Sequence, residues 1–294
     1  MKRIDFDFIE QHFPLRPDDA HKGTMGTLCS LTGSCGFSGA AILSAKAALR
    51  TGVGLHYQII PGCIYPIFAS SVFESVCVPV QGNGKSFCRD DFAAISPILK
   101  KATAVLIGCG MGNSTDTAAV LHQTLRNAGC PLVIDADGIN ALSGHIHILD
   151  DAKGEIILTP HVKEFSRLSG LSVENILSDP AAVAADFARK HAGVTLVLKG
   201  HRTYVAKDGD LYENIAGNSG MAKGGSGDVL AGIIASLAAQ GAAPFDAAVM
   251  GVHIHALAGD IAAAKLSRTA MLPSDIIRSL PEIYRLIEDN RDNG

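Results

Sequence analysis

Thr27-Leu-Cys-Ser-Leu-Thr32 is an apolar run of strand length, and the turn Gly33-Ser-Cys-Gly-Phe-Ser-Gly39 follows it directly. Residues 40–50 are rich in alanine, with apolar side chains on nearly every side of a helical pattern, which predicts a buried helix. A strand, a turn and a helix in this order are typical of parallel sheets, in which helices return the chain between strands. This stretch therefore predicts an α/β fold.

The same alternation recurs along the rest of the chain. Strands are predicted at 53–60, 104–107, 131–135, 156–158 and 195–198, and helices at 89–100, 115–128, 180–191, 226–240, 244–265 and, as a pair, within 273–289. Thr203–Ala206 and Asp210–Glu213 flank Lys207-Asp-Gly209, which is a hairpin signature. Thr159-Pro160 predicts a helix start, with Thr159 as the cap and Pro160 as the first residue. We expect a single domain over residues 1–294, an α/β sandwich with a mostly parallel central sheet and helices on both faces.

The composition favours a packed protein that binds small molecules. Of the 294 residues, 47% are hydrophobic and 18% are charged, which excludes disorder. The net charge is −4 and no basic block occurs, so nucleic-acid binding is not expected. Seven scattered cysteines without a C-x-x-C pair indicate reduced thiols in a cytosolic protein.

No membrane segment is expected from the sequence. Asp5 and Asp7 stand where a signal peptide needs an apolar stretch. The longest uncharged run, residues 51–73, is interrupted by glycines and prolines. We therefore predict a cytoplasmic protein.

The segment Gly217-Asn-Ser-Gly-Met-Ala-Lys-Gly-Gly-Ser-Gly-Asp228 leads directly into an apolar helix. A helix start presents unpaired N–H groups and the positive end of the dipole, and glycines let an anion approach them closely. Gly225, Ser226 and Gly227 are therefore predicted to bind a phosphate or a developing phosphoryl charge. Asp228 is either a partner of the helix dipole or the general base for a hydroxyl that is being phosphorylated.

Two further glycine-rich turns follow strands, at 33–39 and at Gly108-Cys-Gly-Met-Gly112. Neither matches the dinucleotide-binding fingerprint, and the chain has no P-loop pattern. Chain reversal explains each turn alone. Three such turns in one parallel-sheet protein favour a nucleotide-type ligand.

Polar residues also gather near the predicted strand ends. The H-x-x-E spacing puts His161 and Glu164 on one helical face, where they either hold a metal or form a capped helix end with Glu164 exposed. Asp135 and Asp137 close a strand, as ligands of Mg²⁺ through water or, for Asp137, as a helix cap. Lys199 ends another strand, and the basic loop after it suits a nucleotide phosphate or ribose.

Eight segments together carry a family resemblance. They are His21-Lys-Gly-x-x-Gly26, Gly33-Ser-x-Gly-x-x-Gly-Ala40, Ala45-Lys-Ala-Ala-Leu-Arg-Thr-Gly52, Gly108-x-Gly-x-Gly112, Asp135-Ala-Asp-Gly-Ile-Asn140, Thr159-Pro-His-x-x-Glu164, Lys199-Gly200 and Gly217-Asn-x-Gly-Met-Ala-x-Gly-Gly-x-Gly-Asp-Val-Leu230. The sequence resembles the ADP/ATP-dependent NAD(P)H-hydrate dehydratase family of the ribokinase-like superfamily. The last block combined with Thr-Pro-His-x-x-Glu is specific to the family, whereas Gly-x-Gly-Asp alone indicates only the superfamily.

The resemblance implies a metabolite-repair reaction on the S epimer of hydrated NADH or NADPH (NADHX or NADPHX). ADP or ATP phosphorylates the ring hydroxyl with the help of Mg²⁺, and loss of phosphate restores NAD(P)H. By the same resemblance Asp228 is the base, and Gly225, Ser226 and Gly227 form the anion hole. The hydrate faces Ala40, Gly110, His161 and Asp228, the nucleotide faces Lys199, Gly200, His201, Arg202, Thr203 and Gly227, and Glu164 joins the Mg²⁺ network through water.

The sequence departs from the family pattern at several positions, which are Cys109, Val162-Lys163, Ser219, Lys223 and Ser226. Lys223 is expected to place a cation beside the anion hole and to alter nucleotide preference. Only about twenty residues precede the first motif, too few for the N-terminal epimerase domain of many family members. We therefore expect a separate NAD(P)H-hydrate epimerase as a functional partner, and a homo-oligomer, with a tetramer favoured.

Two alternatives remain open at this point. A small-molecule kinase of the same fold, such as one resembling hydroxyethylthiazole kinase, would use the same phosphate site, because fold similarity does not fix the substrate. A nucleotide-binding regulator without turnover is the third possibility. The intact Asp228 and its glycines argue against the regulator.

Overall fold

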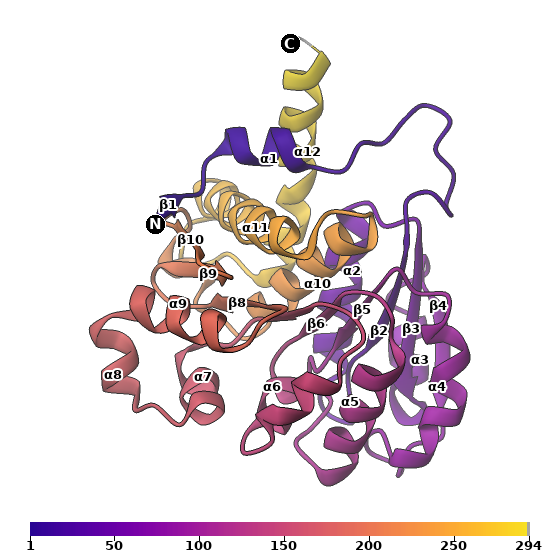
Figure 1. The fold of residues 1–294 in the computed structure, drawn as a ribbon. Helices are drawn as coiled ribbons and strands as arrows, with labels where there is room; N and C mark the ends of the chain where they lie inside the picture. Colours follow the sequence, from indigo (N-terminus) through magenta and orange to yellow (C-terminus); the bar gives the residue numbers. More distant parts are fainter. Residues whose placement is uncertain (293–294) are drawn as a thin grey trace.

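The computed structural model describes residues 1–292, and within them ten strands form one sheet (Figure 1). In sheet order they are β1 (Lys2–Arg3), β10 (Asp210–Asn214), β9 (Thr203–Lys207), β8 (Val194–Leu198), β7 (Ile156–Leu158), β6 (Leu132–Ile134), β5 (Ala104–Ile107), β2 (Thr27–Leu31), β3 (Leu55–Pro61) and β4 (Val76–Val80). Neighbours from β8 to β4 are parallel, and β9 is antiparallel to both β8 and β10. The predicted mostly parallel sheet is confirmed.

Helices cover both faces of the sheet (Figure 1). One layer contains α1 (Phe6–His12), α2 (Ser38–Arg50), α10 (Ser226–Ala239), α11 (Pro244–Leu266) and α12 (Pro273–Asp292). The other contains α4 (Phe92–Leu99), α5 (Thr115–Asn127), α6 (Asp137–Leu142), α7 (Val162–Ser169) and α9 (Pro180–Lys190), with α8 (Val173–Ser178) beside it, and α3 (Tyr65–Ala69) packs near β4. The fold class predicted from the sequence is therefore correct.

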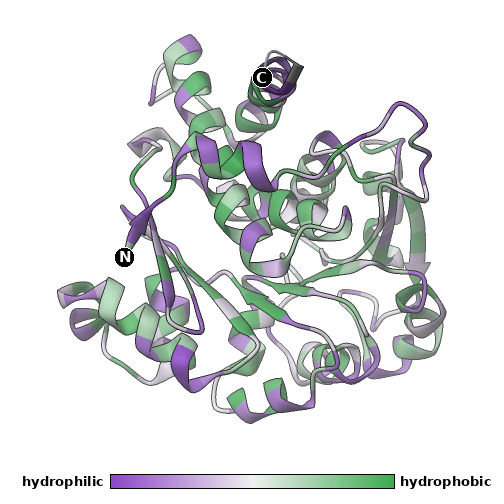
Figure 2. Cartoon of the chain, turned by 45° about the horizontal axis from the view of Figure 1, so that its top comes forward, coloured by the Kyte–Doolittle hydropathy of each residue, from purple (hydrophilic) through white to green (hydrophobic). Residues whose placement is uncertain are grey.

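Side chains alternate between the two faces of the sheet along each strand, and this alternation gives one hydrophobic core on each face. Leu106 and Val133 face the α10 layer, whereas Val105 and Ile107 face the α5 layer. Successive strand side chains point to opposite faces, so a strand buried on both sides is apolar throughout. Figure 2 shows this as hydrophobic colour along the central strands and mixed colour on the outer helices.

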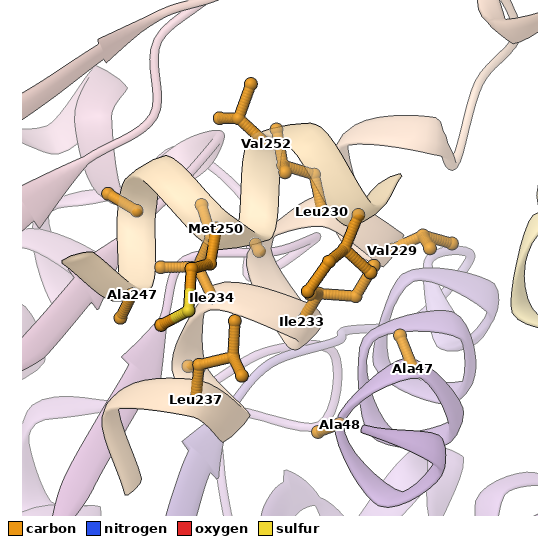
Figure 3. Close-up of a cluster of buried hydrophobic side chains, with 14 of the residues drawn as sticks. Ala47, Ala48, Val229, Leu230, Ile233, Ile234, Leu237, Ala247, Met250 and Val252 are labelled. Atoms are coloured by element: carbon orange, nitrogen blue, oxygen red, sulfur yellow. The ribbon is translucent and has the colours of Figure 1, made fainter. Parts of the chain in front are cut away.

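Helix α10 is the centre of the first layer, and nearly all its residues are buried (Figure 3). It packs against α2 and α11 through contacts that need glycine. A Cβ on Gly232 would lie 2.2 Å from the carbonyl oxygen of Ser44 in α2, and one on Gly251 would lie 2.5 Å from Ile234. These close approaches fix the position of α10 relative to α2 and α11, and therefore the position of its N-terminus over the sheet edge.

Helix α11 is long and apolar enough to cross a membrane, by length and composition only. However, 72% of its most apolar 18-residue window is buried inside the molecule. Its contacts with α10, α12 and the sheet explain its apolar character as that of a core helix.

Helices α1, α3 and α8 were not predicted from the sequence, and two predicted helical regions differ in detail. Helix α7 begins at Val162 with His161 as its cap, because the Thr159 hydroxyl is used elsewhere, 2.7 Å from a carboxylate oxygen of Asp135. The region after Pro273 forms one helix rather than two, although Pro281 lies inside it. Buried residues on one face of α12, among them Leu280 and Ile283, hold it together across that proline.

Candidate active site

The carboxyl ends of β5, β6, β7 and β8 converge on one buried carboxylate, Asp135, which is 2% exposed. Lys199, after β8, donates from Nζ to Asp135 Oδ1 at 2.8 Å. Thr159, after β7, donates its hydroxyl to the same oxygen at 2.7 Å. This arrangement is the strand-end site that open parallel sheets provide, and it leaves Asp135 Oδ2 directed toward other groups.

The N-terminus of α10 lies directly over this ion pair. Gly225 caps the helix with φ +101, a left-handed conformation that favours glycine, and a Cβ there would meet Leu43 at 2.6 Å. A Cβ on Gly227 would lie 3.2 Å from Lys199 Nζ and 3.8 Å from Asp135 Oδ2. The helix start, its dipole and the Lys199 ammonium therefore converge on one small region that suits an anion.

Within that helix start the three predicted anion-binding residues differ. The Ser226 amide donates to the Lys223 carbonyl at 3.2 Å, and the buried Ser226 hydroxyl has no hydrogen-bond partner among the described residues. The amides of Gly227 and Asp228 have no partner inside the helix, because the first N–H groups of any helix lack one. These two amides are the groups best placed to bind a phosphoryl oxygen.

Asp228 projects from the first turn of α10 toward Asp135 and Cys109. Ligand atoms of these three residues all lie within 4.8 Å of one another, and Cys109 Sγ lies 3.7 Å from Asp135 Oδ2. Burial, and then the negative charge of Asp135, raise the pKa of Asp228 to about 7. A carboxyl with this pKa exchanges a proton readily near neutral pH, which suits a general base.

Lys199 keeps its charge in spite of burial. Desolvation alone lowers the pKa of this ammonium, but the carboxylates of Asp135 and Glu164 outweigh it and raise the pKa overall. The site therefore holds a fixed positive charge next to a carboxyl, Asp228, that titrates.

His161 and Glu164 form a capping box at the start of α7. His161 Nδ1 accepts the backbone N–H groups of Lys163 and Glu164, both at 3.1 Å, and Glu164 Oε2 accepts the His161 N–H at 2.9 Å. Burial lowers the pKa of His161. Glu164 is buried, not exposed as the capped-end interpretation of the sequence expected, because its carboxylate folds back over the helix start.

Two of the residues predicted at the hydrate, Ala40 and Gly110, lie close together. A Cβ on Gly110 would lie 2.8 Å from Cβ of Ala40, and the Ser34 hydroxyl donates to the Gly110 carbonyl at 2.8 Å. Gly110 follows Cys109, which contacts Asp135. Of the predicted hydrate residues, Gly110 is thus next in the chain to a residue that contacts the buried carboxylate.

The basic loop after β8 is only partly directed at the site. Lys199 reaches Asp135, and Gly200 and His201 form the exposed turn before Thr203 begins β9. Arg202 instead donates to the buried Glu213 carboxylate at 2.7 Å. Arg202 is therefore held at the hairpin in this structure.

Lys223 does not stand beside the anion hole. Its Nζ donates to the carbonyl of Thr269 at 2.6 Å and to that of Met271, so its charge ties the glycine-rich segment to the chain before α12. The expectation that Lys223 adds a cation to the phosphate site is wrong, because these carbonyl groups bind its ammonium.

Sequence reasoning left Asp137 open as a helix cap, and the structure assigns that position to Ala136, which has φ +49. Asp137 Oδ2 instead accepts the Gly112 N–H at 2.8 Å. The contacts among Lys199, Thr159 and Asp135 were not predicted either. They join residues up to 64 positions apart, and the only sequence signal was that each follows an apolar strand.

The fold and this site together define an α/β protein of the ribokinase-like class. A crystal structure of the Bacillus subtilis ADP/ATP-dependent NAD(P)H-hydrate dehydratase, co-crystallised with ATP and Mg²⁺, superposes with a TM-score of 0.85 at 26% identity, covering 97% of this chain and 98% of that one. The hydroxyethylthiazole kinase of Pyrococcus horikoshii, with a TM-score of 0.60 and 16% identity, shares the fold alone.

The family model described as NAD(P)H-hydrate dehydratase matches residues 28–282, and the chain belongs to this family. The ADP-dependent (S)-NAD(P)H-hydrate dehydratase of Neisseria meningitidis is 37% identical over 253 residues, which are 85% of this chain and 81% of the relative. A bifunctional NAD(P)H-hydrate repair enzyme of Moorella thermoacetica is 38% identical over 286 residues, 96% of this chain. The chain spans about half, 53%, of that relative's length. The predicted family is confirmed, and the kinase alternative is not favoured.

Proposed function

We propose that this chain dehydrates the S epimer of NADHX or NADPHX to NADH or NADPH at the expense of ADP or ATP. The observation that carries the proposal is Asp228, a carboxyl with a pKa near 7 placed at the start of α10 beside the Lys199 ammonium. Family membership and the name of the Neisseria relative support the substrate class.

Asp228 takes the proton from the ring hydroxyl as the hydroxyl oxygen attacks the terminal phosphorus of the nucleotide. The bond from phosphorus to the bridging oxygen breaks, and the shortened nucleotide leaves. The amides of Gly227 and Asp228, the helix dipole and Lys199 stabilise the charge on the transferring group. The lone pair of the ring nitrogen then expels phosphate, which is a better leaving group than hydroxide. Loss of a proton from the adjacent ring carbon to water then re-forms the ring double bond.

The remaining predicted site residues fall into two groups, one at the hydrate and one at the nucleotide. We propose that Ala40, Gly110 and His161 contact the hydrate, on the side of the site nearest Cys109. The nucleotide lies along Lys199, Gly200, His201, Thr203 and Gly227, and Arg202 joins them after exchanging Glu213 for a nucleotide oxygen. The exchange releases the half-exposed Arg202 guanidinium from the buried Glu213 carboxylate, which keeps the Tyr204 hydroxyl as a donor at 3.3 Å. Nucleotide binding therefore has to offset the cost of leaving that carboxylate without its cation.

We also propose Mg²⁺ as the metal that accompanies the nucleotide. The donor set fits a hydrated ion: Asp135 Oδ2 is not engaged by Lys199, and the Glu164 carboxylate is held close to Lys199, as the electrostatic coupling between them indicates. Hard oxygen ligands suit Mg²⁺, which retains water, whereas the Cys109 thiol does not. When bound with the phosphates, Mg²⁺ offsets the charge that gathers on the transferring group.

We propose further that the enzyme acts in the cytoplasm, as a homo-oligomer with a tetramer favoured. A separate NAD(P)H-hydrate epimerase would supply the S epimer, since the Neisseria relative is named for that epimer.

The fate of the phosphorylated product tests the proposal against a kinase of the same fold. Incubation of hydrated NADH with nucleotide and Mg²⁺ is followed by the near-ultraviolet absorbance of reduced nicotinamide and by free phosphate. We expect one NADH, one phosphate and one shortened nucleotide for each turnover, and no lasting phosphate ester. Absence of NADH recovery with both ADP and ATP, together with phosphorylation of a thiazole alcohol, would contradict the proposal.

A further inference from the structure

Cys35 and Cys63 are exposed, whereas the other five cysteines of the chain are buried or half-buried. Cys35 lies in the turn between β2 and α2, and Cys63 lies in the short helix η1 (Gly62–Ile64) after β3. Since β2 and β3 are parallel neighbours, these two segments leave the same edge of the sheet side by side.

One carbonyl group brings the two cysteines together. The Cys35 N–H donates to the Lys85 oxygen at 2.7 Å, and Cys63 Sγ donates to the same oxygen at 3.6 Å. Because both groups bind one oxygen, the Cys63 sulfur lies no more than about 6 Å from the backbone nitrogen of Cys35. A disulfide further requires the two Cα atoms to come within about 4.4–6.8 Å of each other. The segments already touch, because a Cβ on Gly33 would lie 2.7 Å from Ile64 Cδ1.

The turn that carries Cys35 also holds the proposed hydrate site. Ser34, its neighbour, donates to the Gly110 carbonyl at 2.8 Å. Gly110 in turn packs against Ala40 and Phe37 at the start of α2. A covalent change at Cys35 is therefore one residue away from the hydrogen bond that orders this side of the site.

We propose that Cys35 and Cys63 form a thiol modification site that reacts with small disulfides, and that closing the bridge between them weakens binding of the hydrate. One thiolate attacks a sulfur of oxidised glutathione and releases one glutathione thiol. The second cysteine then attacks the protein sulfur of the mixed disulfide and releases the other. Two protein thiols and one glutathione disulfide give one protein disulfide and two glutathione thiols, so electrons and protons balance.

The contacts that the disulfide replaces explain why we expect hydrate binding to weaken. An S–S bond is about 2 Å long, so closure removes the bond from Cys63 to the Lys85 carbonyl and draws Cys35 toward η1. Ser34 then moves relative to Gly110. The effect on the hydrate rests on the proposed function, whereas bridge formation does not. Lys199 and the start of α10 lie on other segments, and nucleotide binding should stay unchanged.

The test treats the full chain with oxidised glutathione and measures two quantities. Non-reducing peptide mass analysis reports whether the Cys35 and Cys63 peptides are linked, independently of activity. Kinetics report KM for the hydrate before and after treatment, and after dithiothreitol. Cys35→Ser and Cys63→Ser each remove one partner, and Cys130→Ser is a matched control on a half-buried thiol of another segment.

After treatment we expect linked peptides in the unsubstituted protein and in Cys130→Ser, and a rise in KM of at least about threefold that dithiothreitol reverses. Each single variant at Cys35 or Cys63 should carry a mixed disulfide and no link. Mixed disulfides on both cysteines without a link would contradict the proposed disulfide between Cys35 and Cys63. A link that leaves KM unchanged would contradict its proposed effect on hydrate binding. Failure of the proposed function is recognised separately, as absence of hydrate turnover in the reduced protein.

Discussion

Asp228 carries a negative charge in a place where burial opposes it. Because its pKa is raised to about 7, chiefly by burial, the active carboxylate is lost as the pH falls through neutrality. We expect kcat/KM to decline below about pH 7, and Asp228→Asn to lower kcat by roughly 10²- to 10⁴-fold with little change in nucleotide affinity. Asp246→Asn, at the equivalent position of α11, is the matched control, and should leave the rate unaffected. Near-normal turnover of Asp228→Asn would leave only a helix-dipole role.

The same residue should lower stability in a pH-dependent way. The folded pKa of about 7 lies above the ordinary 3.8, so the folded state binds the additional proton between these values and the unfolded state does not. The resulting destabilisation is absent below about pH 4 and complete above about pH 7. Asp228→Asn should therefore raise Tm at pH 8, by an amount equivalent to about 4 kcal/mol, and not at pH 4. Equal shifts at both pH values would contradict the raised pKa.

Substitution of Gly227 tests whether an anion approaches the start of α10 closely. Its Cβ would occupy the space between Lys199 and Asp135, but the nearest atom is the movable end of a lysine, and its φ needs no glycine. Gly227→Ala should therefore fold with a small loss of Tm and lose most turnover, equivalent to about 3 kcal/mol of transition-state stabilisation. Gly129→Ala, where a Cβ meets open space, should change neither quantity. Full activity in folded Gly227→Ala would rule out the close-approach argument.

At the scale of elements, α10 depends on glycine where it crosses α2. A Cβ on Gly232 would lie 2.2 Å from the Ser44 carbonyl, which is backbone and cannot move without shifting a helix. Gly232→Ala should lower the stability by about 1–3 kcal/mol through overpacking. Gly39→Ala in α2, which meets no atom, should instead raise stability slightly through helix propensity. Thermal unfolding of both variants checks the prediction, and a neutral Gly232→Ala would mean that the helices are free to separate.

Element positions were predictable where periodicity and turn chemistry agree. The hairpin of β9 and β10 around Asp208 and Gly209, and the strand β5, lie where the sequence placed them. Edge strand β4 and the two-residue β1 were missed, because half-exposed or very short strands carry no buried apolar run. Pro281 misled the prediction of α12, since local propensity ignores the tertiary contacts that hold a helix across a proline.

At the scale of the whole molecule, the glycine block before α10 predicted an anion site from sequence, because glycine followed by a helix start has a local physical meaning. The ion pair of Lys199 with Asp135, and the pKa of Asp228, arise only when four strand ends meet. Lys223 shows how a tertiary contact can change a local prediction. Its place in the glycine-rich segment suggested a cation for the anion site, but its ammonium binds the backbone carbonyl of Thr269 instead.

Buried histidines should set the acid limit of the whole fold. Burial lowers the pKa of His56 to about 3 and that of His255 to about 4, whereas the unfolded values lie near 6.5. Below pH 6.5 the unfolded state therefore binds protons that the folded state refuses, and stability falls as the pH drops toward 4. His56 sits between the hydroxyls of Ser30 and Ser75, at 2.9 and 2.6 Å, and no carboxylate among the described residues offsets the effect of burial on its pKa.

We expect Tm to decline steadily from pH 6.5 to pH 4, and the decline to be shallower in His56→Gln, whatever the Tm of that variant at neutral pH. The slope is the informative quantity, because the substitution also removes packing and hydrogen bonds, which shifts Tm at every pH. His147→Gln, on an exposed residue, should keep the original slope. If His56→Gln and the unchanged protein lose Tm in parallel as the pH falls, then His56 is protonated in the folded state and the acid limit lies elsewhere in the molecule.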